Sequence, residues 1–176
     1  INVVTLKGKQ IYLRALEKKD LDFLYLLEND TSVWEVSGTV TPYSKDVLRF
    51  YLENAHRDIF DVKQLRLVIC THEHNTLGLI DVFDFEPNHK RAGIGIVILN
   101  QAERNKGIGA EAITLLTEYL FEALGLRQVY ANILEDNLAS LHLFQKLGFQ
   151  QVGVKKDWVR FKNAFKNEIL LQKINS

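Results

Sequence analysis

This chain of 176 residues has no net charge, a single cysteine and no long apolar run. Each of these features excludes a class of protein. Lysine and arginine total 22, as do aspartate and glutamate, so the basic excess that usually accompanies a nucleic-acid partner is missing. Cys70 is the single cysteine, which excludes an intrachain disulfide and favours a reducing compartment. No segment approaches the roughly 18 consecutive apolar residues that a membrane span needs. We therefore expect neither a nucleic-acid partner nor a membrane partner.

The ends of the chain and its composition favour one cytoplasmic domain. The N-terminus lacks the charged-then-apolar pattern of a secretory signal. The sequence begins at Ile1 and contains no methionine, so we expect the initiator residue to have been removed or left out. It has no linker rich in proline, glycine or serine, no low-complexity tract and no repeat. With 47% apolar and 25% charged residues, we expect residues 1–176 to form a single globular domain.

The spacing of the apolar residues switches between a period of two and a period of about 3.6, which predicts a mixture of strands and helices. Leu65–Cys70 and Leu77–Phe83 are predicted to form a hairpin. The clearest helix runs from about Ile108 to Ala123 and presents one apolar stripe. The order of elements predicts a mixed α/β layer with an antiparallel N-terminal part. The other expected elements are strands near 11–13, 93–99, 128–134, 151–154, 158–161 and 168–172, and helices after Asp20, after Ser44 (with apolar positions up to Ile59) and after Asn137.

The segment 104–110 joins a strand to this helix and has the composition of an anion site. A diphosphate needs several convergent donors, which the free N–H groups of a first helical turn supply. Glycine at 107 and 109 lets the backbone approach the phosphates, and Arg104 and Lys106 add cationic donors. The alternative is a tight strand–helix connection without a ligand. A nucleoside-triphosphate loop is excluded because G-x-x-x-x-G-K-[ST] is absent, and the G-x-G-x-x-A match at Gly107 lacks the βαβ series of a dinucleotide fold.

Several stretches match, in order, the signatures of one enzyme family. R-N-K-G-I-G at 104–109 matches R/Q-x-x-G-x-G/A. N-L-A-S at 137–140 and F-Q-K-L-G-F at 144–149 are similar to N-x-x-S/A…Y-x-K-x-G-F, and 11–17 followed by 20–21 resembles an opening strand and first helix. On these matches the sequence resembles the GNAT acetyltransferases over nearly its whole length. The resemblance implies a mixed α+β fold with a central, mostly antiparallel twisted sheet, splayed at the cofactor site, and helices on both faces.

The same resemblance implies an acetyl-CoA-dependent N-acetyltransferase, with acetyl-CoA as the co-substrate. The segment 104–110, which we call the glycine turn, would hold the pyrophosphate. Backbone N–H groups of the preceding strand, 93–99, would bind the pantetheine and polarise the thioester carbonyl. Asn137, expected as a helix cap, would also contact the pantetheine. The residues expected to bind the cofactor are Val97, Ile98, Leu99, Arg104, Asn105, Lys106, Gly107, Ile108, Gly109, Ala110, Asn137, Ser140 and Phe144.

The chemistry requires a group that takes a proton from the amine. A primary amine with a pKa near roughly 10 is protonated at neutral pH, so a carboxylate must accept a proton directly or through water. Asp84 and Glu86, which share one face of a regular strand, are the expected base, with Asp81 on the other face as a second candidate. The alternative is that all three are solvated residues at a strand end. Relatives often carry a carboxylate in the strand before the glycine turn, and its absence from 93–99 favours a water relay.

The departing thiolate must in turn receive a proton. Phe144 stands where many relatives of the family have a tyrosine that serves as this acid, and phenylalanine cannot donate a proton. Ser140, one turn earlier on the same predicted helix, is the candidate donor to the sulfur, and otherwise it is a solvated surface residue. A thiol is already acidic, with a pKa of roughly 8.5, so water alone is the alternative.

The acceptor site is expected around the segment that follows the first predicted helix. An aromatic side chain and carboxylates there would suit the positively charged alkyl chain of a polyamine. The alternative is ordinary packing with surface charges. The residues expected to line the site are Glu28, Trp34, Glu35 and Asp81.

The stretches 27–33 and 78–92 are similar to the polyamine (spermidine or diamine) acetyltransferases and to neighbours that acetylate ribosomal-protein N-termini. We therefore expect a small-molecule polyamine as the acceptor, with a peptide N-terminus as the alternative. An antibiotic aminosugar, or CoA binding without catalysis, are the rival functions. Homo-oligomers are common among such relatives, so we expect self-association. The five histidines have no ligand spacing, so no metal is expected.

Overall fold

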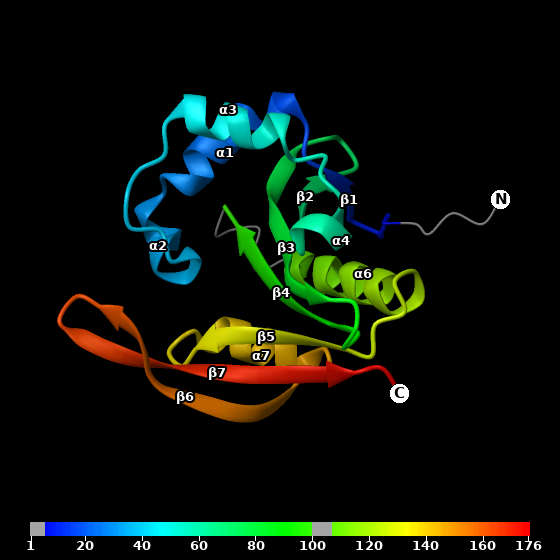
Figure 1. The fold of residues 1–176 in the computed structure, drawn as a ribbon, viewed down its shortest axis with the longest axis vertical. Helices are drawn as coiled ribbons and strands as arrows, with labels where there is room; N and C mark the ends of the chain where they lie inside the picture. Colours follow the sequence, from blue (N-terminus) through cyan, green and yellow to red (C-terminus); the bar gives the residue numbers. More distant parts are fainter. Residues whose placement is uncertain (1–5, 100–106) are drawn as a thin grey trace.

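The computed structural model describes residues 6–99 and 107–176, and a seven-stranded sheet runs through them in the order β1-β2-β3-β4-β5-β7-β6 (Figure 1). Neighbouring strands are antiparallel except β4 and β5, which are parallel. The predicted mixed α+β fold with a mostly antiparallel sheet is confirmed. The strands are β1 (Ile11–Ala15), β2 (Leu65–Thr71), β3 (Thr76–Glu86), β4 (Arg91–Ile98), β5 (Gln128–Leu134), β6 (Gln150–Phe161) and β7 (Ala164–Ile174).

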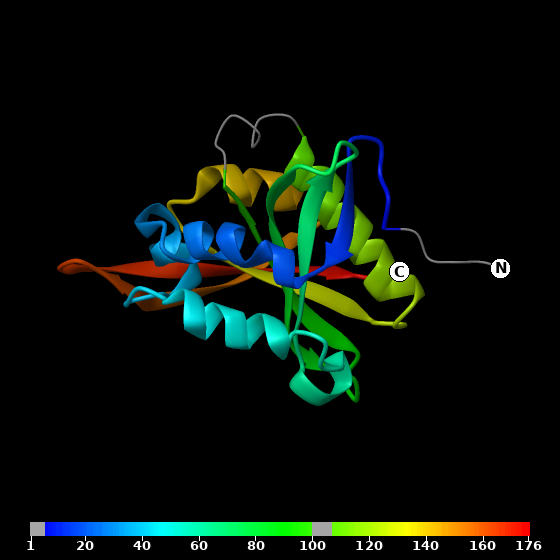
Figure 2. The same cartoon turned by 90° about the horizontal axis from the view of Figure 1, so that it is seen from above.

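Helices pack on both faces of the sheet (Figures 1 and 2). On one face, a core that includes Leu24, Leu48 and Leu79 joins the first helices to β2 and β3. On the other face, a larger core that includes Leu116 and Phe144 joins the sheet to the long helix and to the last one. The helices are a 3-10 turn η1 (Lys18–Asp20), α1 (Leu21–Glu28), α2 (Thr31–Ser37), α3 (Lys45–Glu53), α4 (Ile59–Val62), α6 (Ile108–Glu122) and α7 (Leu138–Lys146).

Three elements differ from the sequence expectations. Helix α2 is not among the elements expected from the sequence, although its cap residue Asp30 accepts the Ser32 N–H (2.9 Å), as a helix start requires. The second expected helix ends at Glu53, and α4 is a separate turn. The expected strands at 151–154 and 158–161 form one strand, β6, whose register shifts between Lys155 and Val159.

The parallel strands β4 and β5 remain together over a short distance only. They pair at three positions, from Arg91 opposite Gln128 to Gly93 opposite Tyr130. Beyond Gly93, β4 continues to Ile98 against β3, while β5 continues against β7, so the two strands diverge (Figure 1). The sheet is therefore open between its N-terminal and C-terminal halves. We call this opening the gap.

A buried ion pair fixes the corner where β1 leads into α1. Asp20 is 3% exposed and accepts two hydrogen bonds from Arg14, at 2.9 and 2.8 Å, and one from the Glu17 N–H at 2.8 Å. Burial raises the pKa of the Asp20 carboxyl, but the hydrogen bonds from Arg14 and Glu17 outweigh burial and lower it below its ordinary value. The folded state therefore favours the ionised carboxylate.

Replacing this carboxylate gives a prediction about acid stability. At pH 7, Asp20→Asn is expected to lower the free energy of unfolding by about 2 kcal/mol, because hydrogen bonds to a charged group are lost. A carboxyl whose pKa is depressed by folding stabilises the protein fully above the unfolded pKa of about 3.9, and that contribution disappears as the pH falls through the folded pKa. Urea unfolding at pH 7 and pH 3.5 should show the difference between wild type and variant shrinking. Asp22→Asn, at an 85% exposed side chain, is the control and should change little at either pH; a constant difference for Asp20→Asn would contradict the argument.

Candidate functional site

The first turn of α6 lies at the open end of the gap. Gly107, the N-cap residue, has a φ of 76°, a left-handed conformation that glycine adopts without strain. Glu111 N–H is the first to bond within the helix, to the Gly107 carbonyl, so the N–H groups of Ile108, Gly109 and Ala110 have no partner inside the helix. A helix start of this kind is a site for an anion. The predicted residues Arg104, Asn105 and Lys106 lie outside the described residues.

Gly109 sits where the turn packs closely between β4 and α7. A Cβ added to it would lie 3.1 Å from Leu143 Cδ2, 3.7 Å from Ile98 Cδ1 and 3.9 Å from Ile96 Cδ1. The absence of a side chain therefore allows the first turn of α6 to approach α7 across the gap. A pocket of about 440 Å³ lies on the other side of this turn, where the predicted residues Gly107 and Ala110 face residues 8–10.

The start of α7 is built as the sequence predicts. Asn137 caps this helix by accepting the Ser140 N–H (3.3 Å), and Ser140 is half-buried. Phe144 is 2% exposed and packs edge-on against Phe149, with ring centroids 4.9 Å apart. Only Glu135 and Asp136 separate Asn137 from the end of β5, so the starts of α6 and α7 flank the two strands that diverge. The predicted contacts of Asn137, Ser140 and Phe144 with the cofactor stay predictions.

The backbone donors at the end of β4 differ from the expectation. The Leu99 N–H donates to the Leu77 carbonyl of β3 (3.1 Å), so its predicted role as a donor to the pantetheine is wrong. Antiparallel pairing alternates along a strand, and Val97, two residues earlier and opposite Leu79, therefore also directs its N–H toward β3. Ile96 and Ile98 direct theirs toward the gap. The prediction thus shifts from Val97 and Leu99 to Ile96, with Ile98 on the same edge.

Asp84 and Glu86 lie at the closed end of the gap, and their expected arrangement is corrected. Asp84 has a φ of 48°, and the register of β3 against β4 shifts between Phe83 and Glu86, so the strand is not regular there and the expected shared face does not follow. Glu86 pairs with Arg91, the first residue of β4, whereas the glycine turn follows the last. The seven steps from Arg91 to Ile98 along an extended strand span about 23 Å, so Glu86 lies about that far from the end of β4 that leads to the glycine turn.

Asp81 belongs instead to a half-buried cluster that the structure assembles around Arg66. Arg66 donates from Nε and Nη2 to the two oxygens of Asp81 (2.7 and 3.1 Å) and from Nη1 to Glu28 (2.7 Å). Burial alone would lower the pKa of the Arg66 guanidinium, but the adjacent Asp81 and Glu28 carboxylates outweigh it and raise the pKa above its ordinary value. Burial also raises the pKa of the neighbouring Tyr51. Two predicted acceptor-site carboxylates are therefore held together, and both are committed to Arg66.

Two glycines of β4 shape the surface beside this cluster. A Cβ on Gly93 would lie 2.3 Å from the Phe83 ring, so this ring occupies the space that a side chain at position 93 would need. A carboxylate, which relatives often carry in this strand, would not fit at this position. Phe83 in turn packs edge-on against Tyr130, with centroids 5.9 Å apart. Gly95, opposite Asp81 in the register, leaves open space, with Phe83 at 3.9 Å as its neighbour. An acceptor can therefore approach the backbone of β4 next to Asp81.

The other predicted acceptor residues continue this arrangement onto the C-terminal half. The Trp34 indole N–H donates to the Glu28 carbonyl (2.8 Å), which joins α2 to α1. The neighbouring Glu35 forms an ion pair with Lys166 of β7, and Lys166 also contacts Asp136 (2.6 Å), in the turn before α7. A chain of contacts thus leads from β3 through α1 and α2 to β7. Glu28, Trp34, Glu35 and Asp81, predicted together from sequence, all belong to it.

Sequence reasoning missed Arg66, Asp136, Lys166 and Tyr130. Arg66 had a signal, because it is the one charged residue in the strand Leu65–Thr71. Lys166 and Asp136 had none, since charged residues are common in turns and near strand ends, and the residues that Lys166 contacts lie far away from it in the sequence. Tyr130 sits at the last paired position of β4 and β5; burial raises the pKa of its phenol, and Asp84 and Glu86 add to this effect.

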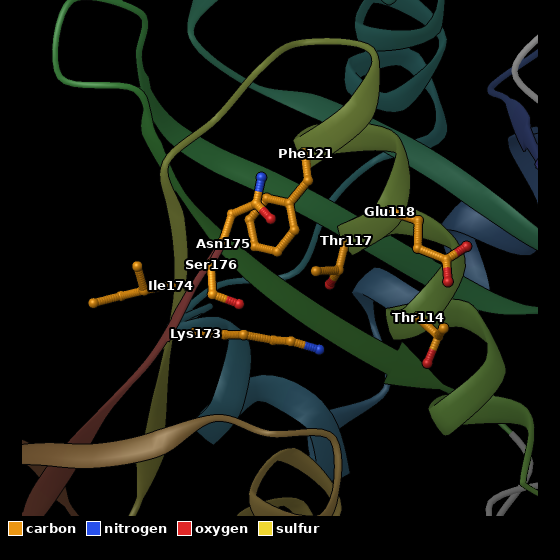
Figure 3. A pocket seen from close by; sticks show the side chains of 8 residues that line it. All are labelled: Thr114, Thr117, Glu118, Phe121, Lys173, Ile174, Asn175 and Ser176. Atoms are coloured by element: carbon orange, nitrogen blue, oxygen red, sulfur yellow. The ribbon is translucent and has the colours of Figure 1, made fainter.

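A different pocket, of about 210 Å³, lies further along α6, next to the end of β7 (Figure 3). The buried Thr117 hydroxyl has no hydrogen-bond partner among the described residues. No residue predicted for the functional site lines this pocket. The lining residues are Thr114, Thr117, Glu118, Phe121, Lys173, Ile174, Asn175 and Ser176.

No helix in 6–99 or 107–176 is long and apolar enough to cross a membrane. In the same ranges, no three or more His, Cys, Asp and Glu side chains are grouped so that they could hold a metal ion.

Comparison with known proteins gives consistent results. A family described as an acetyltransferase (GNAT) domain matches residues 10–150. The spermidine N(1)-acetyltransferase of Escherichia coli K12 is 31% identical over 144 residues, 81% of this chain and 74% of that protein. The enzyme of the same name from Vibrio cholerae serotype O1 is 29% identical over 146 residues, 83% of this chain and 82% of that protein. The crystal structure of spermidine N-acetyltransferase from Vibrio cholerae with CoA and spermine superposes with a TM-score of 0.85 at 25% identity, covering 95% of this chain and 96% of that chain.

Proposed function

Because the chain belongs to the GNAT acetyltransferase family, and is therefore an acetyl-CoA-dependent N-acetyltransferase, we propose that its acceptor is a polyamine of the spermidine type. The names of the relatives support this acceptor. The observation that carries the proposal is the chain of carboxylates along the gap, from Asp81 and Glu28 to Glu35 and Asp136. The family uses acetyl-CoA, which supplies an activated acetyl group that an amine nitrogen can take up directly.

The described residues fit this cofactor. The first turn of α6 offers the N–H groups of Ile108, Gly109 and Ala110 to the pyrophosphate, and Gly107 and Gly109 keep side chains out of its way. Ile96 directs its N–H from the edge of β4 into the gap, where it can bind an amide carbonyl of the pantetheine. All of these donors lie on the β4 side of the opening, so the cofactor would lie along the edge of β4 that diverges from β5.

The charges along the gap fit an acceptor with more than one ammonium. Glu28 and Asp81 carry two negative charges against the one positive charge of Arg66, which leaves −2 + 1 = −1. Glu35 and Asp136 likewise leave −2 + 1 = −1 with Lys166. A triamine that presents one neutral amine to the acetyl group keeps two ammonium groups. A peptide N-terminus would leave both sites without a partner unless its side chains were basic.

Proton transfer in this site is proposed to run through water. Asp81 is held by two hydrogen bonds to Arg66, which suits an anchor for an ammonium better than a base. The exposed carboxylates Asp84 and Glu86, at the closed end of the gap, can receive the amine proton through water. Phe144 has no proton to donate, so Ser140 or water protonates the thiolate.

The test is release of free thiol from acetyl-CoA with a panel of acceptors. Spermidine is expected to have a kcat/KM at least about tenfold above that of butylamine, because the second and third ammonium groups each find a carboxylate. Glu28→Gln should raise the KM for spermidine severalfold and leave the KM for acetyl-CoA unchanged, while Asp61→Asn, at an exposed position, should change neither. Turnover of alanyl or seryl peptides without turnover of polyamines would overturn the proposal. A solved relative from Vibrio cholerae is described as dodecameric, and light scattering on the same samples tests whether this chain also self-associates.

A further inference from the structure

Lys166 makes the contacts that a bound amine would make. It belongs to β7, and its Nζ contacts the carboxylates of Glu35 on α2 and Asp136 before α7. The same Nζ lies 4.6 Å from the centroid of the Phe161 ring, within the range of a cation–π contact. Asp136 first, and then Glu35, raise the pKa of the Lys166 ammonium, so it is charged at neutral pH.

Two carboxylates and an aromatic ring are the groups that recognise an alkylammonium. At this place they come from three different elements, α2, the turn after β5 and the end of β6, and the protein's own lysine occupies the centre. The place is joined to the Arg66 cluster through Trp34 and Glu28, and it links α2 to the C-terminal half of the sheet. An acceptor anchored near Asp81 would extend toward it.

We propose that Lys166 is a specificity-determining residue, whose ammonium competes with a distal ammonium of the acceptor for Glu35 and Asp136. The inference rests on the proposed function and deepens it. With Lys166 in place, a long polyamine must displace it or share the two carboxylates with it. Without the lysine charge, both carboxylates are available to the acceptor. A monoamine has no distal ammonium for which Lys166 could compete.

A purely structural role makes a different prediction. If the Lys166–Glu35 ion pair only holds α2 against β7, then Lys166→Gln and Glu35→Gln break the same link. Both variants would then change the KM for spermidine in the same direction, and both would change turnover of butylamine. Competition predicts opposite signs, because Lys166→Gln removes the competitor and Glu35→Gln removes the group that is competed for.

The experiment measures KM and kcat for spermidine and for butylamine in wild type, Lys166→Gln, Lys166→Arg and Glu35→Gln. We expect Lys166→Gln to lower the KM for spermidine about fivefold and Glu35→Gln to raise it about threefold, since each changes one charge at a partly exposed site. Lys166→Arg, which keeps the charge, should stay within about twofold of wild type. Butylamine is the reference acceptor, and the ratio of kcat/KM for spermidine to kcat/KM for butylamine should rise in Lys166→Gln and fall in Glu35→Gln. Changes of the same sign in Lys166→Gln and Glu35→Gln, or equal changes with both amines, would overturn the inference.

Calorimetric titration of spermidine into the CoA-saturated proteins separates this inference from the proposed function. If wild type acetylates no polyamine, the proposed function fails, and the titration still decides the role of Lys166. Tighter binding of spermidine to Lys166→Gln than to wild type, with weaker binding to Glu35→Gln, supports competition. Equal binding to all the variants overturns it, whatever the acetylation assay shows.

Discussion

Gly109→Val is expected to raise the KM for acetyl-CoA about a hundredfold, which is the largest effect on activity that the structure predicts. A Cβ at this position would already lie 3.1 Å from Leu143 Cδ2, and valine adds two methyl groups beyond it. The first turn of α6 must then move away from α7, and its N–H groups no longer point toward the pyrophosphate. The overpacking itself costs about 1–3 kcal/mol of stability, which a domain of this size can absorb.

The matched control for this variant is Gly153→Val. Gly153 lies in β6, where a Cβ would meet no atom within 4 Å. Titration of CoA and initial rates of thiol release should show the loss of affinity in Gly109→Val and its absence in Gly153→Val. An unchanged KM in a folded Gly109→Val protein would mean that the cofactor does not lie against this turn.

Arg66→Met is expected to lower the free energy of unfolding by about 2.5 kcal/mol, the largest single effect on stability. Breaking a buried ion pair typically costs about 3–5 kcal/mol because the remaining charge is uncompensated, and the 28% exposure of Arg66 reduces that cost. Here two carboxylates, Glu28 and Asp81, would be left facing each other without a cation. A loss of this size corresponds to a decrease in Tm of roughly 8 °C for a chain of this length.

Arg57→Met provides the comparison for Arg66→Met, because it makes the same substitution at an exposed ion pair with Asp61. It should change the free energy of unfolding by less than about 0.5 kcal/mol. Adding Glu28→Gln and Asp81→Asn to Arg66→Met removes the uncompensated charges and should recover about half of the loss. Equal losses for the two arginine variants, or no recovery in the triple variant, would show that the Arg66 cluster is not an electrostatic unit.

Local signals in the sequence were enough to predict the two helix starts on which the proposed cofactor site depends. Gly107 before an amphipathic run and Asn137 before a short one are helix starts whose geometry depends on neighbouring residues, and both helices begin where predicted. The strands from Leu65 to Leu134 were also predicted, because their apolar residues repeat at short intervals. These elements, which place the start of α6 at the gap, could be predicted without knowing which residues contact each other across the fold.

The acceptor side could be predicted only as a set of residues. Glu35 and Lys166 are separated by 131 positions, and no local pattern selects one lysine among many as a partner. No local pattern predicts the irregular backbone at Asp84 either, because a bulge in β3 depends on how β4 pairs with this strand. Sequence reasoning therefore assigned Asp84 and Glu86 a regular alternation that the strand does not have.

The register shift in β6 has a consequence for how the protein behaves at high concentration. As the last strand of the sheet, β6 exposes a backbone edge that could template the addition of strands from other chains. The shift between Lys155 and Val159, with Asp157 at a φ of 48°, interrupts that edge in its middle, and the exposed Lys156 adds a positive charge there. Neither segment of the edge is a long, flat, apolar template. The protein is thus protected against fibrillar aggregation from this edge, and contact with another copy there would rely on side chains such as the exposed Trp158.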